Sequence, residues 1–181
     1  TPESIQWLLD RQDEGEVFRY VTVDAPADGH DNLLQPNMTM RYGLDDVRGY
    51  DSIISAQYVD YMRTVQIQPQ LDFNRIAPLY LDRLDDIDWT RLNLLNVRYI
   101  VTHNEVELPE EMLTASDPRR FPPQLELVYE TPAAKIYRNN GALPRVSMLE
   151  PLDGQIPDFG TQYVGGIPAT ITRDTGRERF V

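Results

Sequence analysis

The sequence predicts an α/β (α+β) fold, in which a mixed sheet is flanked by helices and a C-terminal antiparallel three-stranded meander follows. Two patterns predict this fold. Up to residue 102, apolar residues at helical spacing are interspersed with short β-branched and aromatic runs; from residue 125, strand-like alternation is broken by turn residues. The hydrophobic fraction of 41% is typical of a globular domain and excludes disorder of the whole chain.

Two elements are predicted in the first 23 residues. Thr1 can cap a helix in which Pro2 is the first helical residue, with Ile5 and Leu8 at helical spacing before Gly15 ends it. Residues 17–23 are rich in β-branched and aromatic side chains, which predicts a strand. A loop follows to about residue 33.

Two further helices and a strand are predicted between residues 51 and 102. Asp51 and Ser52 can cap a helix with one continuous apolar stripe, formed by Ile54, Tyr58, Tyr61, Met62 and Val65. Asp88 can cap a helix over 89–95, which Asn96 ends before a strand over 97–102. A helix, a tight turn and a strand in this order indicate an α/β unit.

The rest of the chain is predicted to consist of loops and antiparallel strands. Residues 103–124 are rich in acids and prolines and predict a solvated loop. Strands are predicted over 125–130, 134–138 and 143–149, the last two joined by a type I′ turn at Asn140-Gly141.

The predicted domain organisation has three parts. Residues 1–150 form the α/β domain. Residues 151–168 are rich in glycine and proline and predict a linker or long loop. Residues 169–181 are interpreted as the start of a truncated β-rich module, because 169–172 resemble a strand without partners.

Composition limits the possible partners and context. With 17 basic and 29 acidic residues the net charge is −12, which disfavours nucleic acid and anionic lipid surfaces as partners. The absence of cysteine excludes disulfides, thiolate nucleophiles and Cys-ligated zinc. No apolar run approaches the roughly 18 residues needed to span a bilayer. Because the chain begins at Thr1 without a basic-then-apolar leader, we expect a segment of a longer polypeptide, with any membrane anchor outside it.

The acidic residues offer one pattern associated with metal binding. Asp86 and Asp88 form a D-x-D pair, which some glycosyltransferases use to hold Mg²⁺ or Mn²⁺ on a nucleotide sugar. We favour a helix cap as the role of Asp88, because two-residue patterns are frequent in so acidic a chain. Asp24, Asp28 and Asp31 miss the spacing of a calcium-binding EF-hand. The sequence therefore indicates no metal site and no cofactor.

Other catalytic motifs do not occur in the sequence. His30 and His103 belong to no short motif with a serine nucleophile or a second metal ligand, and each is interpreted as a loop or strand-end residue. The sequence contains no phosphate-binding loop, dinucleotide fingerprint or basic patch with interleaved aromatics. No catalytic residue is assigned.

Residues 37–51 have the least ordinary composition, with Asn, Arg, Tyr and Asp around Gly43 and Gly49. Both glycines permit backbone geometry or close approach that other residues do not. Arg48 either fixes a turn through bonds to carbonyls or a buried carboxylate, which we favour, or helps to hold a polar ligand. The candidate ligand-binding residues are Asn37, Arg48, Tyr50 and Asp51.

Short motifs follow one another in a distinctive order along most of the sequence. They are Phe18-Arg19, Pro36-Asn37, Tyr42-Gly43, Val47-Arg48-Gly49-Tyr50-Asp51, Leu94-Leu95-Asn96-Val97-Arg98-Tyr99-Ile100-Val101, Val128-Tyr129-Glu130 and Leu143-Pro144-Arg145-Val146. In this order and spacing the protein resembles the soluble region of the YfhO-like bacterial membrane proteins. That family is part of the C-type glycosyltransferase superfamily.

The resemblance implies a polytopic parent protein with a large extracytoplasmic portion at the bacterial cell membrane. Some members are implicated in glycosylating cell-envelope polymers from lipid-linked sugars. In such enzymes the catalytic acid lies in a loop between early transmembrane helices, to which nothing here corresponds, so we expect this fragment to lack the active site. The implied partners are the transmembrane portion of the parent and a lipid-linked sugar or envelope glycan. The resemblance also implies truncation at Val181.

Three functions remain open from the sequence. The favoured function is that of an extracytoplasmic domain contributing recognition or support to a glycosyltransferase-like parent. The second is a free-standing, metal-dependent sugar-nucleotide enzyme using Asp86 and Asp88, and the third is a non-catalytic protein-interaction module. Apolar stretches of about 20 residues beside this segment in the full gene would favour the first function over the second.

Overall fold

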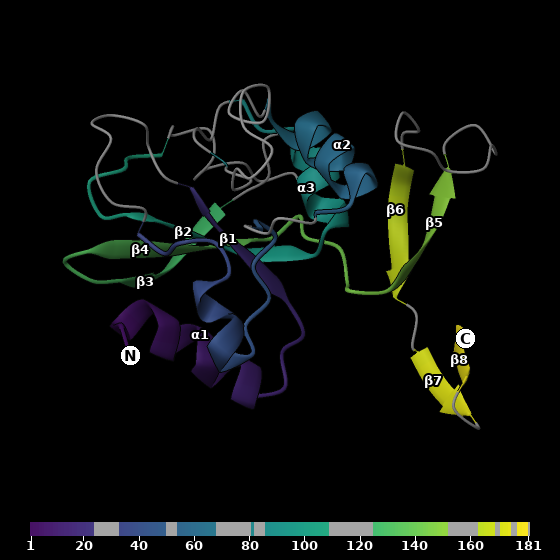
Figure 1. Cartoon of the computed structure of the whole chain (residues 1–181), viewed down its shortest axis with the longest axis horizontal. Coiled ribbons are helices and arrows are strands. Elements are labelled where there is room, and N and C mark those ends of the chain that lie inside the picture. Colours follow the sequence, from purple (N-terminus) through teal and green to yellow (C-terminus); the bar gives the residue numbers. More distant parts are fainter. Residues whose placement is uncertain are drawn as a thin grey trace. The chain divides into compact units, whose positions relative to one another are not determined.

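The computed structural model describes residues 1–23, 33–49, 54–67, 81, 86–108, 125–151, 163–168, 171–174 and 177–180. It forms two units, Thr1–Ala142 and Leu143–Val181 (Figure 1). The described helices and a four-stranded sheet belong to the first unit, and two separate two-stranded sheets belong to the second.

The first unit is built on a mixed sheet with strands in the order β1-β2-β4-β3. The bounds are β1 Arg19–Val23, β2 Val97–His103, β3 Leu125–Glu130 and β4 Ala134–Asn139. β1 and β2 are parallel, whereas β2–β4 and β4–β3 are antiparallel. Because parallel strands need a crossover connection, the long segment between β1 and β2 can carry helices. The predicted mixed sheet is confirmed.

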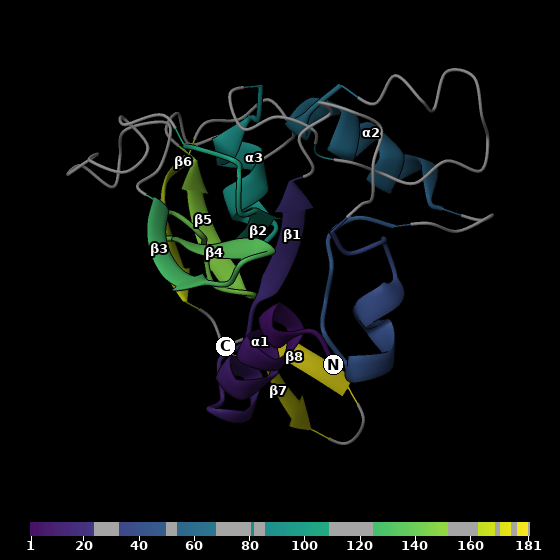
Figure 2. The same cartoon turned by 90° about the vertical axis from the view of Figure 1, so that its left-hand side faces the viewer.

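Helices cover both faces of this sheet. Their bounds are α1 Glu3–Asp13, the 3-10 helix η1 Met38–Tyr42, α2 Ala56–Val65 and α3 Trp89–Leu94. α1 lies on one face, and α2 and α3 lie on the other (Figures 1 and 2). The predicted flanking of the sheet by helices is confirmed.

The two faces of the sheet carry separate cores. Tyr20 packs with Ile5 and Leu8 of α1, whereas its neighbour Val21 belongs to the core that contains Met62 of α2 and Leu92 of α3. Successive side chains of a strand point to opposite faces, so alternate residues of β1 fill different cores. The sequence predicted this strand from its β-branched and aromatic side chains.

Two of the three predicted helix caps differ in the structure. α1 begins at Glu3, so Pro2 rather than Thr1 occupies the cap position, and the helix start has no hydrogen bond from a capping side group. The extended backbone of Pro2, with ψ 145°, starts the helix one residue later than predicted. α2 begins after Ser55 rather than Ser52, which lies outside the described residues with Asp51. The backbone of Ser55, with φ −56° and ψ 129°, is not helical, so the helix starts later than predicted.

The apolar stripe of α2 and the cap of α3 are confirmed. All five stripe residues are buried in, or packed against, the core on the α2 and α3 face: Ile54, Tyr58, Tyr61, Met62 and Val65. The Asp88 carboxylate accepts a hydrogen bond of 3.1 Å from the backbone N–H of Arg91. Asn96 ends this segment in a left-handed conformation, with φ 60°, and β2 begins at Val97.

The third strand of the predicted meander lies elsewhere. β3 and β4 form the expected hairpin, but β5 (Ser147–Pro151) pairs with β6 (Tyr163–Pro168) instead of β4. β4 has no free edge to offer, because β2 occupies one edge and β3 the other. Pro144 also lacks the N–H that a strand directly after the turn would donate. The predicted hairpin across Asn140-Gly141 is therefore wrong.

The second unit also differs from the predicted organisation. It begins at Leu143, and strand β6 lies inside the predicted linker 151–168. Gly165 and Gly166 weaken the strand pattern there, which is why the sequence favoured a loop. β7 (Ile171–Asp174) pairs with β8 (Arg177–Phe180), so the strand predicted near 169–172 is not without a partner.

Candidate functional site

The segment that contains the candidate ligand-binding residues is attached to β1 on the edge opposite β2. Tyr20 pairs with Asp46 in a short parallel bridge. The backbone N–H of Tyr20 donates to the carbonyl of Asp45 at 3.0 Å, and the N–H of Val47 donates to the carbonyl of Tyr20 at 3.1 Å. Backbone pairing therefore places Arg48 directly beside the sheet.

Arg48 is buried and held by several acceptors. Its Nη2 donates to Oδ2 of Asp46 at 2.8 Å, to Oγ1 of Thr22 at 2.9 Å and to the carbonyl of Leu34 at 2.7 Å. Its Nε also lies 3.2 Å from Oδ1 of Asp46. The side chains of Arg48 and Asp46 are 0% and 2% exposed. Arg48 thus joins β1, the backbone at residue 34 and its own segment.

The spacing of Asp46 and Arg48 explains how the pair forms. One residue separates Asp46 from Arg48, and the backbone bends at Val47 between them, so the carboxylate and the guanidinium meet. The planar guanidinium then uses two nitrogens on one carboxylate, which is the geometry of a strong, charge-assisted pair. The backbone N–H of Arg48 also donates to Oδ1 of Asp46 at 2.8 Å, which fixes the turn between them. These bonds match the structural interpretation of Arg48.

Two tyrosines extend this polar cluster. The hydroxyls of Tyr20 and Thr39 share a hydrogen bond of 2.5 Å, which ties η1 to β1. The hydroxyl of Tyr58 on α2 donates to the carbonyl of Val47 at 2.5 Å. Burial raises the pKa of Tyr58 to about 12, and burial followed by the charge of Asp46 raises the pKa of Tyr20. Both phenols are therefore held in the neutral form, as hydrogen-bond partners.

The other residues of the segment have different outcomes. Asn37 and Gly43 bracket η1 in left-handed conformations, with φ 67° and 75°, so the predicted need for glycine at 43 is confirmed. Gly49 does not have a positive φ, and a Cβ there would meet only Ile54 at an ordinary 3.8 Å, so the predicted requirement for glycine at 49 is wrong. Tyr50 and Asp51 lie outside the described residues.

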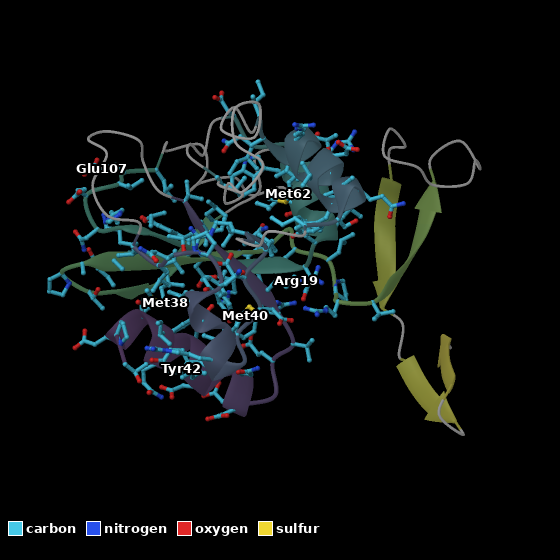
Figure 3. The ribbon with its side chains drawn as sticks, viewed as in Figure 1. Arg19, Met38, Met40, Tyr42, Met62 and Glu107 are labelled. Carbon is cyan, nitrogen blue, oxygen red and sulfur yellow. The ribbon has the colours of Figure 1, made fainter. Side chains whose placement is uncertain are left out.

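The buried cluster contains residues that the sequence analysis did not select: Tyr20, Thr22, Leu34, Thr39 and Asp46. It holds a surface element, because Thr39 of η1 is bonded to Tyr20. Met38 and Met40 of η1, labelled in Figure 3, are 41% and 67% exposed. Asp46 could have been identified from its spacing to Arg48. Thr22 and Leu34 could not, because they are distant in sequence and carry no motif.

Asp88 of the D-x-D pair serves as a helix cap. Both oxygens of Asp88 are engaged with Arg91, one with its backbone N–H at 3.1 Å and the other with its Nε at 3.2 Å. In the described part of the protein, no group of three His, Asp or Glu side chains is arranged to hold a metal ion. His103 is the last residue of β2, as predicted, whereas His30 lies outside the described residues.

Two further findings concern the protein as a whole. Within the ranges that the structure describes, the helices are too short and too polar to cross a bilayer. Comparison of the sequence with protein-family models, curated proteins and solved structures finds no match.

Proposed function

We propose that this protein is an extracytoplasmic domain of a multispanning bacterial membrane protein of the YfhO-like type. In this proposal the domain supports the parent or recognises its substrate. It catalyses no bond formation itself. Its partners are the transmembrane portion of the parent and a lipid-linked sugar or cell-envelope glycan. The parent acts as a C-type glycosyltransferase-like protein on the outer side of the cell membrane.

The burial of Arg48 and its pairing with Asp46 favour a structural role for the domain. Arg48 belongs to the motif 47–51 of the resemblance, yet its guanidinium is buried and neutralised by Asp46. A charge held in this way fixes the backbone around it and is not offered to an external ligand. We therefore assign Arg48 to the framework and leave Tyr50 and Asp51 as the residues that would contact a ligand.

Other motifs of the resemblance also meet one another in the fold. The backbone N–H of Arg19 donates to the carbonyl of Asn96 at 3.0 Å, and Nη1 of Arg19 donates to the carbonyl of Leu95 at 3.3 Å. The rings of Phe18 and Tyr99 pack edge to face with their centroids 4.8 Å apart. Motifs from separate parts of the sequence are thus joined at the start of the parallel strand pair, which agrees with a structural use of the shared residues.

The location is tested in the full-length parent. The full gene should encode several apolar stretches of about 20 residues outside this segment. Alkaline phosphatase, which folds only outside the cytoplasm, is fused after Val181 in the parent, and its activity is measured in whole cells. An active fusion is expected. An inactive phosphatase with a fluorescent cytoplasmic reporter at the same position would contradict the proposal.

The division between support and binding is tested by two variants in the same parent. Arg48→Ala should lower folded yield and envelope glycosylation together, because it removes a framework residue. Tyr50→Phe should lower glycosylation while leaving the melting temperature unchanged, because we propose that Tyr50 contacts a ligand and does not stabilise the fold. Unchanged glycosylation in Tyr50→Phe would remove the recognition half of the proposal.

The enzymatic alternative is tested on the 181-residue protein alone. We expect no sugar transfer when it is incubated with nucleotide sugars or lipid-linked sugars and Mn²⁺ or Mg²⁺, since Asp88 is engaged as a helix cap. Turnover that disappears in both Asp86→Asn and Asp88→Asn would instead establish the metal-dependent enzyme.

A further inference from the structure

One exposed turn carries a chemically labile pair that the proposed function does not use. Asn140-Gly141 is the single Asn-Gly pair in the sequence, and it follows β4 near the end of the first unit. Asn140 is exposed. Because glycine has no side chain beside its backbone nitrogen, that nitrogen can approach the Cγ atom of the asparagine before it.

We propose that Asn140 is a site of spontaneous deamidation, and that Asn139 restrains this reaction in the folded protein. The backbone nitrogen of Gly141 loses its proton and attacks Cγ of Asn140. The new bond from this nitrogen to Cγ closes a five-membered succinimide ring, while the bond between Cγ and Nδ2 breaks and ammonia leaves. Water then opens the ring at either carbonyl and gives aspartate or isoaspartate. The co-reactants are water and hydroxide.

The restraint lies in the hydrogen bonds of the turn. The N–H of Gly141 donates to Oδ1 of Asn139 at 3.0 Å. Asn139 is buried, and its Nδ2 donates to Oδ1 of Asn93 at 2.7 Å and to the carbonyl of Val97 at 2.9 Å, which fixes the direction of Oδ1. Ring closure requires the Gly141 nitrogen to lose the proton that this bond holds, so the turn must open first.

The product would alter the backbone where the second unit begins. Each event adds one negative charge to a protein that already carries a net charge of −12. Isoaspartate also inserts a methylene group into the backbone between Asn139 and Leu143, the first residue of the second unit. The native bond between Gly141 and Asn139 cannot keep its geometry across this longer backbone.

The reaction is measured by peptide mass spectrometry on the full-length protein, incubated in mildly alkaline buffer with and without urea. Trypsin cleaves after Arg138 and Arg145 and releases 139–145, in which fragmentation distinguishes Asn139 from Asn140. The control peptide 92–98 contains two asparagines that precede Leu94 and Val97, whose bulky side chains hinder ring closure. We expect a mass increase of about one dalton at Asn140 and none in the control peptide.

Two comparisons decide the proposal. Conversion should be roughly tenfold faster in urea, because unfolding removes the restraint. Gly141→Ala should slow it roughly tenfold in both conditions, since a methyl group beside the attacking nitrogen raises the barrier. Asn93→Ala, which removes one of the two hydrogen bonds that hold the Asn139 side chain, should accelerate conversion only in the folded protein. Absence of conversion in urea would overturn the site, and equal rates with and without urea would overturn the restraint.

Discussion

Two acid–arginine pairs in this molecule use the same groups in different surroundings. Asp46 and Arg48 lie 2.8 Å apart with side chains 2% and 0% exposed, whereas Asp88 and Arg91 lie 3.2 Å apart with side chains 42% and 22% exposed. In both pairs the carboxylate also accepts the backbone N–H of its arginine. Local geometry is therefore similar, and burial is the main difference.

Burial changes the consequence of losing one partner. An exposed ion pair is screened by water and contributes about 0–1 kcal/mol, whereas removing one partner of a buried pair costs about 3–5 kcal/mol, because a charge remains without compensation. The same difference in burial distinguishes the two regions where the sequence suggested a functional site, the 37–51 segment and the D-x-D pair. The buried pair anchors the described part of the 37–51 segment, and the exposed pair belongs to a helix end.

The largest effect is expected from Arg48→Ala. This change leaves the Asp46 carboxylate, Thr22 and the carbonyl of Leu34 without their shared donor, so the free energy of unfolding should fall by about 3–5 kcal/mol. Urea denaturation measures the change. Arg41→Ala is the matched control, because Arg41 is exposed on η1 and contacts the ring of Tyr42, and it should cost less than about 1 kcal/mol.

The comparison becomes sharper in a double variant. Replacing both members, as in Asp46→Leu with Arg48→Met, removes the uncompensated charge and should be less destabilising than Arg48→Ala alone. If Arg48→Ala costs no more than the Arg41→Ala control, Asp46 and Arg48 do not anchor the segment.

The second effect concerns Tyr58, whose hydroxyl binds the carbonyl of Val47 beside the buried pair. Its pKa is raised from 10 to about 12 by burial, so between these values the unfolded protein loses a proton that the folded protein keeps. Stability is therefore complete below pH 10 and falls as the pH rises towards 12. This group contributes about 2 kcal/mol of that fall.

Tyr58→Phe should reduce the alkaline loss of stability in urea titrations at increasing pH. Tyr61→Phe is the matched control, because the Tyr61 hydroxyl binds the carbonyl of Arg91, next to the exposed pair. An alkaline fall that is identical in Tyr58→Phe and in the unsubstituted protein would show that Tyr58 does not cause it.

The elements that sequence reasoning predicted correctly depend on neighbouring residues. Asp88 caps α3 and Asn96 ends it, because capping and a left-handed conformation are local properties. The position of β4 in the sheet is not determined by neighbouring residues. Its edge is taken by β2, a strand more than thirty residues earlier in the sequence, and this pairing cannot be inferred from a favourable turn sequence such as Asn140-Gly141.

The candidate site shows the same division. The acceptor types of Arg48, carbonyls and a buried carboxylate, followed from the chemistry of a guanidinium near a core. Asp46 lies within the same segment as Arg48. Thr22 and Leu34 become neighbours of Arg48 only because this segment pairs with β1. Distant partners of this kind leave no periodic pattern in the sequence.

A smaller effect is expected from Asp88→Ala. Loss of the cap leaves the backbone N–H of Arg91 without its acceptor and should lower stability by about 1 kcal/mol, with or without Mn²⁺. Thermal and urea unfolding in both conditions measure it. A melting temperature that rises with Mn²⁺ in the unsubstituted protein but not in Asp88→Ala would contradict the capping role and favour the metal-binding one.

The smallest effect is expected from Arg91→Gln, which separates the ion pair from the cap. The backbone N–H of Arg91 still donates to Asp88, and its carbonyl still accepts from Tyr61, so only the 3.2 Å contact between the two side chains is lost. Because both side chains are partly exposed, the change should be about 0.5 kcal/mol or less and should vanish at high salt. A loss as large as that of Arg48→Ala would mean that burial does not distinguish the two pairs, and the contrast on which the framework role of Arg48 rests would fail.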